Sequence, residues 1–361
     1  MKYAIFSDIH ANPKAFFNAV EDARSLGCEK RIILGDIVGY GPDPSAAIAL
    51  AKKMNTVLLG NHDAAMCGRL GIDWFNEHAA TCIKAQSERV SAAEKLYLQA
   101  LPYQHITSIG NLTCAFSHGS LTCPKDFRYI EDYCDASFEL SSMKRQNIDL
   151  LFVGHTHEAI SYEYCGHNSF MNIIKTHHLD FGEAPLTEQL FLEKNHRYIF
   201  NVGSVGYPRN QRESIYVIFD SDEASITYRR LPFDFAGYCD DLKEKGIPVP
   251  YWLESHLLTH PTCVPTTGID SLAFHGFPTQ KENTTMNKNT KKTVATKKAA
   301  VTKKPAVKAA AKKPVAKKPC AYKECKCQKK AAAKVSVTIK PAAKTALKKT
   351  AKKAVKKSTK K

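Results

Sequence analysis

The sequence lacks any long apolar run. No stretch approaches the roughly 18–20 consecutive apolar residues that a helix needs to cross a bilayer. The first apolar segment is short and leads directly to Asp8, so it does not resemble a secretory signal peptide. Together these two absences predict a cytoplasmic protein.

Paired cysteines are also missing from the first 280 residues. That segment holds nine of the 12 Cys, scattered singly and without a C-x-x-C pair. Such spacing favours reduced, cytosolic thiols over a disulfide framework. The other three, Cys320, Cys325 and Cys327, have no fourth Cys or His nearby and fail the usual zinc pattern. We interpret them as a chance grouping or a reactive thiol cluster.

Acidic and aromatic residues are scarce at the C-terminal end. Residues 281–361 contain 28 Lys, no Arg, two Glu and one aromatic residue, and carry a charge of +26, whereas residues 1–280 carry −9. This Lys/Ala/Pro-rich tail cannot bury enough apolar surface to offset chain entropy, so we expect it to be disordered when free. Dense Lys charge without base-reading groups favours non-specific, salt-sensitive nucleic-acid binding. A solubilising extension is the alternative.

Short apolar runs alternate with amphipathic segments through most of residues 1–231. This alternation indicates parallel βαβ units and an α/β fold. Strands are predicted at 3–7, 31–35, 56–60, 105–109, 112–117, 150–154, 198–202, 215–219 and 225–231. Helices are predicted at 13–26, 45–54, 74–99 and 135–146.

Two segments show no such order. Residues 158–197 have no clear period, and their His167, His177 and His178 are interpreted as solvated loop histidines. We expect this segment to be an inserted cap. Residues 232–280 contain six Pro and are expected to form a loosely packed C-terminal extension of the domain.

Five of the predicted strands end in the same way. Each apolar run is followed directly by Asp, Asn or His, and such breaks of local consistency are expected at functional sites. Open α/β sheets place their sites at the carboxyl ends of strands. The five segments are Ser7-Asp8-Ile9-His10, Gly35-Asp36, Gly60-Asn61-His62-Asp63, Ser117-His118-Gly119 and Gly154-His155-Thr156-His157.

The candidate metal ligands are carboxylates, an amide and imidazoles, with no thiolate. Such a set suits Mn²⁺ best, with Fe, Zn²⁺ or Mg²⁺ as alternatives. The ligands are Asp8, His10, Asp36, Asn61, His118, His155 and His157. Seven are too many for one ion and suit two that share a bridging carboxylate, for which Asp36 is the natural candidate. Two ions ~3.5–4 Å apart clamp the attacking and leaving oxygens at phosphorus and generate hydroxide at neutral pH.

In this order the five segments resemble the signature of calcineurin-like metallophosphoesterases. Asn201–Arg209 and the Gly39–Pro44 loop resemble the small prokaryotic phosphodiesterase branch of that family. The resemblance covers residues 1–231 and implies a four-layer α/β/β/α sandwich of two mixed sheets. It implies hydrolysis of a phosphodiester or phosphomonoester by a metal-bridging hydroxide. One ion would take Asp8, His10, Asp36 and His157, and the other Asp36, Asn61, His118 and His155.

The resemblance also implies roles for residues beside the ligands. His62, oriented by Asp63, would donate a proton to the leaving oxygen or stabilise charge, with a structural imidazole as the alternative. Arg209 is either a phosphate contact or a solvated turn residue. Asn12 and Tyr40 are interpreted as loop residues and not as substrate contacts.

Two classes of function remain open at this point. The first is a dinuclear phosphoesterase. The second is a nucleoid-associated DNA-binding protein with a vestigial phosphoesterase domain, because the tail resembles linker-histone tails in composition. The intact ligand set favours the first. The sequence does not choose among monoester, cyclic diester, dinucleoside polyphosphate and phosphoprotein substrates, nor does it give the native metal or the oligomeric state.

Overall fold

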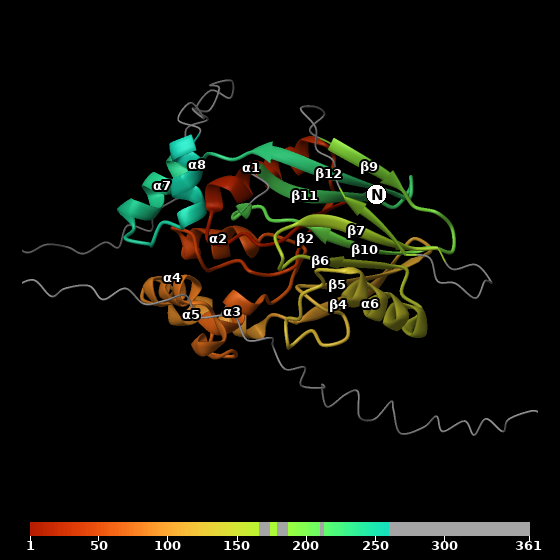
Figure 1. Cartoon of the computed structure of the whole chain (residues 1–361), viewed down its shortest axis with the longest axis horizontal. Helices are drawn as coiled ribbons and strands as arrows, with labels where there is room; N and C mark the ends of the chain where they lie inside the picture. The colour runs from red at the N-terminus through yellow and green to blue at the C-terminus, as the bar shows by residue number, and fades with distance from the viewer. Residues whose placement is uncertain (166–173, 179–186, 210–212, 260–361) are drawn as a thin grey trace, which may run out of the picture. The chain divides into compact units, whose positions relative to one another are not determined.

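The computed structural model describes residues 1–165, 174–178, 187–209 and 213–259 (Figure 1). The predicted tail 281–361, its three thiols and His167 lie outside the described residues. None of the helices in the described ranges is both long enough and apolar enough to cross a membrane.

Two six-stranded sheets form the centre of the described part. The first has the order β3-β2-β1-β11-β12-β9, with β1 (Lys2–Phe6), β2 (Lys30–Ile33), β3 (Thr56–Val57), β9 (Thr187–Phe191), β11 (Glu213–Asp220) and β12 (Ser225–Pro232). The second has the order β4-β5-β6-β10-β7-β8, with β4 (Gln104–Ile109), β5 (Leu112–Ser117), β6 (Leu150–Val153), β7 (Ala159–Tyr164), β8 (Ile174–His178) and β10 (Arg197–Val202).

Both sheets are mixed. β1, β2 and β3 are parallel, and β11 then pairs antiparallel with β1. In the second sheet β5, β6 and β10 are parallel, and the outer pairs β4–β5, β10–β7 and β7–β8 are antiparallel. The parallel strands follow from the predicted βαβ units, since crossover connections leave successive strands pointing the same way.

The helices of the described residues lie outside the two sheets. They are α1 (Pro13–Ser25), α2 (Pro44–Ala51), α3 (Asn61–Met66), α4 (Glu77–Ser87), α5 (Ala92–Ala100), α6 (Tyr133–Gln146), α7 (Phe235–Glu244) and α8 (Tyr251–Thr259). α1 begins where the sequence predicts and α2 one residue earlier. The side chains of Asn12 and Asp43 cap them, and a proline takes the first helical position.

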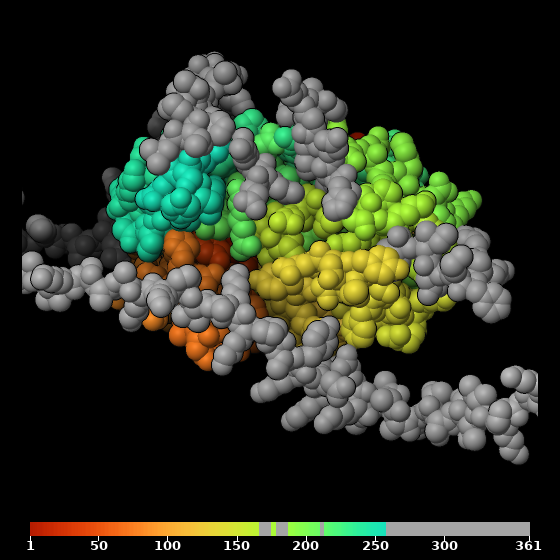
Figure 2. Space-filling view, viewed as in Figure 1, coloured from red at the N-terminus to blue at the C-terminus, as the bar shows by residue number. Residues whose placement is uncertain are grey.

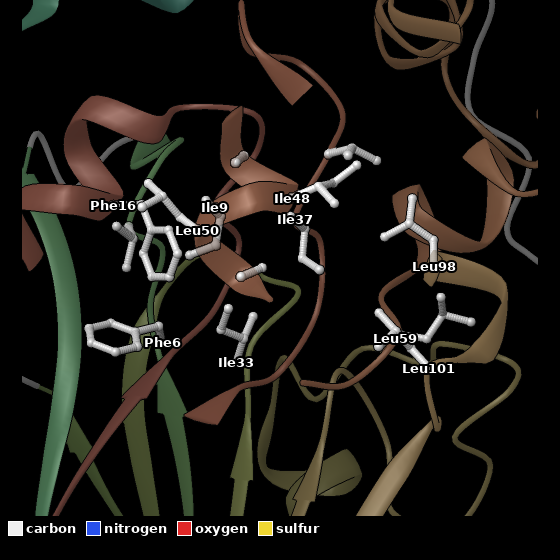
Figure 3. Close-up of a cluster of buried hydrophobic side chains, with 14 of the residues drawn as sticks. Phe6, Ile9, Phe16, Ile33, Ile37, Ile48, Leu50, Leu59, Leu98 and Leu101 are labelled. Carbon is white, nitrogen blue, oxygen red and sulfur yellow. The ribbon is translucent and has the colours of Figure 1, made fainter. Parts of the chain in front are cut away.

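Three buried apolar layers separate these elements, so the predicted α/β/β/α sandwich is confirmed. Between the sheets, Phe152 of β6 meets Phe219 of β11 with ring centroids 6.0 Å apart. Outside the first sheet, Phe6 packs against Phe16 of α1 (Figure 3). Outside the second sheet, α6 packs on β6 and β7.

Several boundaries differ from the sequence prediction, two of them substantially. The single helix expected over 74–99 is wrong: a 3-10 turn (Ile72–Trp74) is followed by the separate helices α4 and α5. Ser91 caps α5, and its hydroxyl and backbone N–H pair with Glu94 in a capping box. The third strand is shorter than 56–60, because the chain turns at Gly60 into α3.

The C-terminal extension is better packed than expected. Phe235, Tyr238 and Leu242 of α7 are buried in a cluster with Tyr40 and with Cys82 of α4. Figure 2 shows the surface of the C-terminal helices lying against the segment that contains α4. The expectation of a loose extension is therefore wrong for residues 233–257.

The described parts of segment 158–197 are mostly strands. β7 and β8 extend the second sheet, and β9 forms an edge of the first. The interpretation of His177 as a solvated loop residue is wrong, because it lies on β8 and its ring contacts Glu163 on β7. His178 also belongs to β8.

Candidate metal centre

The seven candidate ligands lie together at the carboxyl ends of the strands. Asp8 and His10 follow β1, Asp36 follows β2, Asn61 begins α3, His118 follows β5, and His155 and His157 follow β6. All seven are buried. Side chains far apart in sequence thus meet at one place because four parallel strands from two sheets end there.

The first group contains Asp8, His10 and His157, whose ligating atoms lie within 4.8 Å of one another. His10 Nδ1 lies 3.1 Å from the carbonyl of Val38, and His157 Nδ1 lies 2.6 Å from the carbonyl of Tyr207. A carbonyl accepts only, so both rings donate through Nδ1 and present the Nε2 lone pair.

Three acceptors of the first group consequently face one another. The two Nε2 atoms are 3.1 Å apart, and Asp8 Oδ1 lies 3.2 Å from that of His157 and 3.7 Å from that of His10. Asp8 Oδ1 is buried without a hydrogen-bond donor. Lone pairs at this spacing repel unless a cation lies among them, so the residues fit a divalent ion. Histidine ligands are commonly fixed in this way by a backbone carbonyl on the other nitrogen.

The second group contains Asp36, His118 and His155, again within 4.8 Å. Asn61 Oδ1 lies 3.1 Å from His118 Nε2, and His155 Nε2 is buried without a partner. Asp36 Oδ2 lies 3.3 Å from His118 Nε2 and 3.7 Å from His10 Nε2, between the two groups. A carboxylate in that position can bridge two ions.

The pKa values of three histidines in the two groups are consistent with metal binding. Burial lowers the pKa of His155 to about 3 and that of His157 to about 4, so both rings are neutral and able to bind metal at neutral pH. For His118, burial is outweighed by the carboxylate of Asp36, which raises the pKa to about 9. A proton on His118 therefore balances the negative charge of Asp36, which a bound cation would otherwise balance.

The backbone at the centre is strained. Five of the seven candidate ligands have a positive φ, between 46° and 72°: Asp8, His10, Asp36, His155 and His157. Residues other than glycine rarely adopt this backbone region, and each instance costs roughly 1–3 kcal/mol. Such strain concentrates at functional sites, and residue type alone gives no signal of it.

Glycine allows the loops to approach closely. A Cβ on Gly60 would collide with Asp36 Oδ1, and one on Gly39 would collide with the ring of His62. The Gly-rich loop after Asp36 thus leaves room for the side chains of α3.

His62 lies beside the ligands, and its ring packs among aromatic side chains. Its ring is buried in contact with Tyr40 and Phe75, at centroid distances of 4.6 and 4.9 Å, and Nδ1 has no partner. Its backbone N–H donates to Asp36 Oδ1 at 2.9 Å. Burial lowers the pKa of His62 well below its ordinary value, so the neutral ring is favoured.

Asp63 does not touch the ring of His62. Its Oδ1 accepts from the backbone N–H groups of Ile37 and Val38, and its Oδ2 accepts from that of Gly60. Consecutive residues of a helix point in different directions, which separates the two side chains. Asp63 therefore holds the two ligand loops together, and the expected direct orientation of His62 is wrong.

A cavity of about 710 Å³ opens onto the centre. Besides His62 and several ligands, its wall is rich in aromatic side chains: Tyr40, Trp74, Phe75, Tyr129, Tyr207, Tyr251 and Trp252. The ring of Tyr129 stacks on His155 at 3.9 Å, and Tyr40 stacks on Tyr207 at 4.2 Å. Arg209 is half-buried in the same wall.

Sequence reasoning missed most of this wall. Trp74 lies in a stretch predicted as helix, and Trp252 lies in the extension, so neither is near a motif. Tyr40 lies in a loop, as interpreted, and it also lines the cavity. Asn12 caps α1 and donates to the carbonyl of Gly206, in agreement with that interpretation.

Comparisons with known proteins agree with this geometry. Residues 1–224 match the family model described as "Calcineurin-like phosphoesterase superfamily domain". An uncharacterized protein of Methanocaldococcus jannaschii is 30% identical over 258 residues, which is 70% of this chain and 96% of that protein.

Two solved structures share the fold. A metallophosphoesterase from Sphaerobacter thermophilus is 30% identical, with a TM-score of 0.56, over 72% of this chain and 98% of that one. A hypothetical protein from Pyrococcus horikoshii is 19% identical, with a TM-score of 0.54, over 71% and 97%. The family is metal-dependent, and the Asp/His groups described above could hold metal ions. The chain belongs to the calcineurin-like phosphoesterase superfamily.

Proposed function

We propose that the protein is a dinuclear metal-dependent phosphodiesterase acting on a diester that carries a planar aromatic group. The observation that carries the proposal is the pair of ligand groups joined at Asp36, with the Nε2 atoms of His10 and His157 3.1 Å apart. Two divalent cations, Mn²⁺ in the first instance, would supply Lewis acidity at phosphorus and lower the pKa of a bound water toward ~7.

Chain residues have separate roles in this proposal. Asp8, His10, Asp36 and His157 would hold one ion, and Asp36, Asn61, His118 and His155 the other. His62 lines the cavity that opens onto the centre. An anionic substrate favours the protonated ring, which would then donate its proton to the leaving oxygen. Arg209 would neutralise a phosphoryl oxygen.

The cavity wall supports a substrate with a planar group. Trp74 is 44% exposed at the mouth, and Tyr129 and Trp252 are also part of the wall. Exposed aromatic faces bind bases or similar rings by stacking, worth ~1–3 kcal/mol per base. A nucleotide diester offers both the phosphorus and the ring.

A leaving-group series tests the proton transfer. In the Mn²⁺-loaded full chain, His62→Ala should lower kcat by about 10²–10⁴ for a diester with an aliphatic leaving group. The loss should be much smaller for p-nitrophenolate, which departs without a proton. His105→Ala, on β4, is the matched control and should retain activity. Equal losses for both leaving groups would remove the proton-donor role.

A second comparison tests the substrate class. Trp74→Ala should raise KM by roughly 5–150-fold for a nucleotide diester, the equivalent of ~1–3 kcal/mol of stacking. It should have little effect on a small diester without a ring. If KM rises equally for both, or if only monoesters are cleaved, the proposed substrate class is wrong.

The Lys-rich tail carries a separate proposal, from charge alone. We propose that residues 281–361, at +26, bind nucleic acid without sequence preference. Gel shifts at increasing salt should show affinity falling steeply for the full chain, and little binding by a folded chain ending at residue 276. Equal binding by both chains would show that the tail does not bind the nucleic acid. DNA binding without any Mn²⁺-dependent hydrolysis would instead favour the nucleoid-associated alternative.

A further inference from the structure

A second cluster of ligand-type side chains surrounds Glu163. The carboxylate Oε1 lies 2.6 Å from His196 Nδ1, and Oε2 lies 3.0 Å from His177 Nε2. Sγ of Cys165 completes a trio: the ligating atoms of Glu163, Cys165 and His196 all lie within 4.8 Å of one another. Glu163 is 5% exposed, so its charge needs strong partners.

This cluster is remote from the dinuclear centre. Glu163 pairs with Tyr198 near the start of β10, whereas the centre lies beyond the end of that strand. Tyr198 and Val202 are four steps apart along the strand, or roughly 13 Å. The two sites therefore share no residue.

The local structure explains why these side chains converge. Glu163 and Cys165 are two positions apart at the end of β7, which places them on the same face of the extended chain. His196 lies in the turn that leads into β10, the neighbour of β7. Tyr198 lies opposite Glu163 on that same face, in the apolar layer between the sheets.

We propose that Cys165, Glu163 and His196 form a site for Zn²⁺ or a similar thiophilic divalent ion. Thiolate, imidazole and carboxylate are the ligands that zinc takes in proteins, at ~2.0–2.3 Å from the metal. Tetrahedral ligands at those lengths lie about 3–4 Å apart, so small side-chain movements close the site. The fourth position is left to water.

The surrounding groups suit this ion in two respects. His177 and Lys175 contact the second carboxylate oxygen, and the hydroxyl of Tyr198 donates to the first. Such outer partners orient a ligating carboxylate. One thiolate and one carboxylate balance the charge of Zn²⁺, and Lys175 is exposed enough to move away when the ion binds. The ion would join the end of β7 to the start of β10.

Cobalt absorption distinguishes this site from the dinuclear centre, which has no thiolate ligand. The full chain, with Cys320, Cys325 and Cys327 changed to Ser, is stripped with chelator, loaded with Mn²⁺ and titrated with Co²⁺. One equivalent should produce a near-ultraviolet thiolate-to-cobalt band, which an equivalent of Zn²⁺ should bleach. Mn²⁺ prefers oxygen and imidazole ligands and should leave the thiolate site open.

Variants decide which residues bind the ion. Cys165→Ser should abolish the band and His196→Gln should weaken cobalt binding at least tenfold, with the Mn²⁺ content unchanged. Cys134→Ser, at an exposed thiol, is the matched control and should keep the band. Absence of the band in a folded protein, or its survival in Cys165→Ser, would overturn the proposal. Phosphoester hydrolysis measured in the same samples reports on the dinuclear centre independently.

Discussion

Asp8→Asn should stabilise the metal-free protein while weakening its response to metal. Asp8 Oδ2 accepts a hydrogen bond from the backbone N–H of His155 at 3.0 Å, whereas Oδ1 is buried without a donor. The nearest ring atom is the Nε2 lone pair of His157, at 3.2 Å. An asparagine of the same shape can keep the first bond through its oxygen and donate its NH₂ to His157.

The expected gain in stability follows from Asp8 Oδ1 alone. A buried acceptor without a partner costs about 1–3 kcal/mol, which the amide would recover. For a domain of this size each kcal/mol shifts Tm by about 2–4 °C, so Tm should rise by about 2–12 °C in chelator. The unchanged protein should gain about 4 kcal/mol per site when Mn²⁺ is 1,000-fold above its Kd. The variant should gain much less, because an anionic ligand has been lost.

Thermal unfolding followed by circular dichroism at pH 7.5, in chelator and in Mn²⁺, measures both effects. At this pH His157 is neutral, since burial lowers its pKa to about 4. Asp43→Asn is the matched control: Asp43 caps α2, where either residue serves, so neither Tm should change appreciably. A metal-free Asp8→Asn protein that melts below the unchanged one, or an unaltered response to Mn²⁺, would refute the reasoning.

Three further predictions concern other parts of the molecule. Gly39→Ala should displace the ring of His62 and lower kcat at least tenfold with the metal content retained; an unchanged kcat would contradict the packing. Asp22→Ala should lower the free energy of unfolding by about 1–3 kcal/mol in urea titrations, because Arg229 loses two hydrogen bonds at 2.8 and 3.0 Å. Burial raises the pKa of Cys114 to about 12, so at pH 8 mass spectrometry should find this thiol alkylated only after unfolding. Rapid alkylation in the native state would show that β5 opens.

Much of the fold could be predicted from the sequence because its signals are local. Apolar runs of strand length, separated by capped amphipathic segments, gave the βαβ units around β1 and β2. The break between α4 and α5 also has a local signal, the Ser91-x-x-Glu94 capping box, which a helix prediction over 74–99 overlooked.

The candidate ligands could be found for a related reason. Each follows a buried strand directly, and parallel strands bring such positions together at one edge. The positive φ values of Asp8 or His155 could not be predicted, because only the assembled loops enforce them. The failure of Asp63 to reach His62 depends on the short helix α3, where the prediction had a strand end.

Non-local pairing accounts for the features that sequence reasoning missed. The cluster at Glu163 depends on β7 lying between β8 and β10, and residues 158–197 have no period that predicts this order. Likewise, Trp252 reaches the cavity only because α7 and α8 pack against α4 and Tyr207. Tertiary contacts of this kind override composition, which indicated a loose extension.

The most direct test of the dinuclear centre is the number of Mn²⁺ ions bound per chain. Equilibrium dialysis of the full-length protein after chelation, followed by elemental analysis, should give two for the unchanged chain. Asp36→Asn should bind one or fewer, since that carboxylate lies between the two ligand groups. A folded protein that binds fewer than one Mn²⁺, or an Asp36→Asn chain that still binds two, would contradict the account.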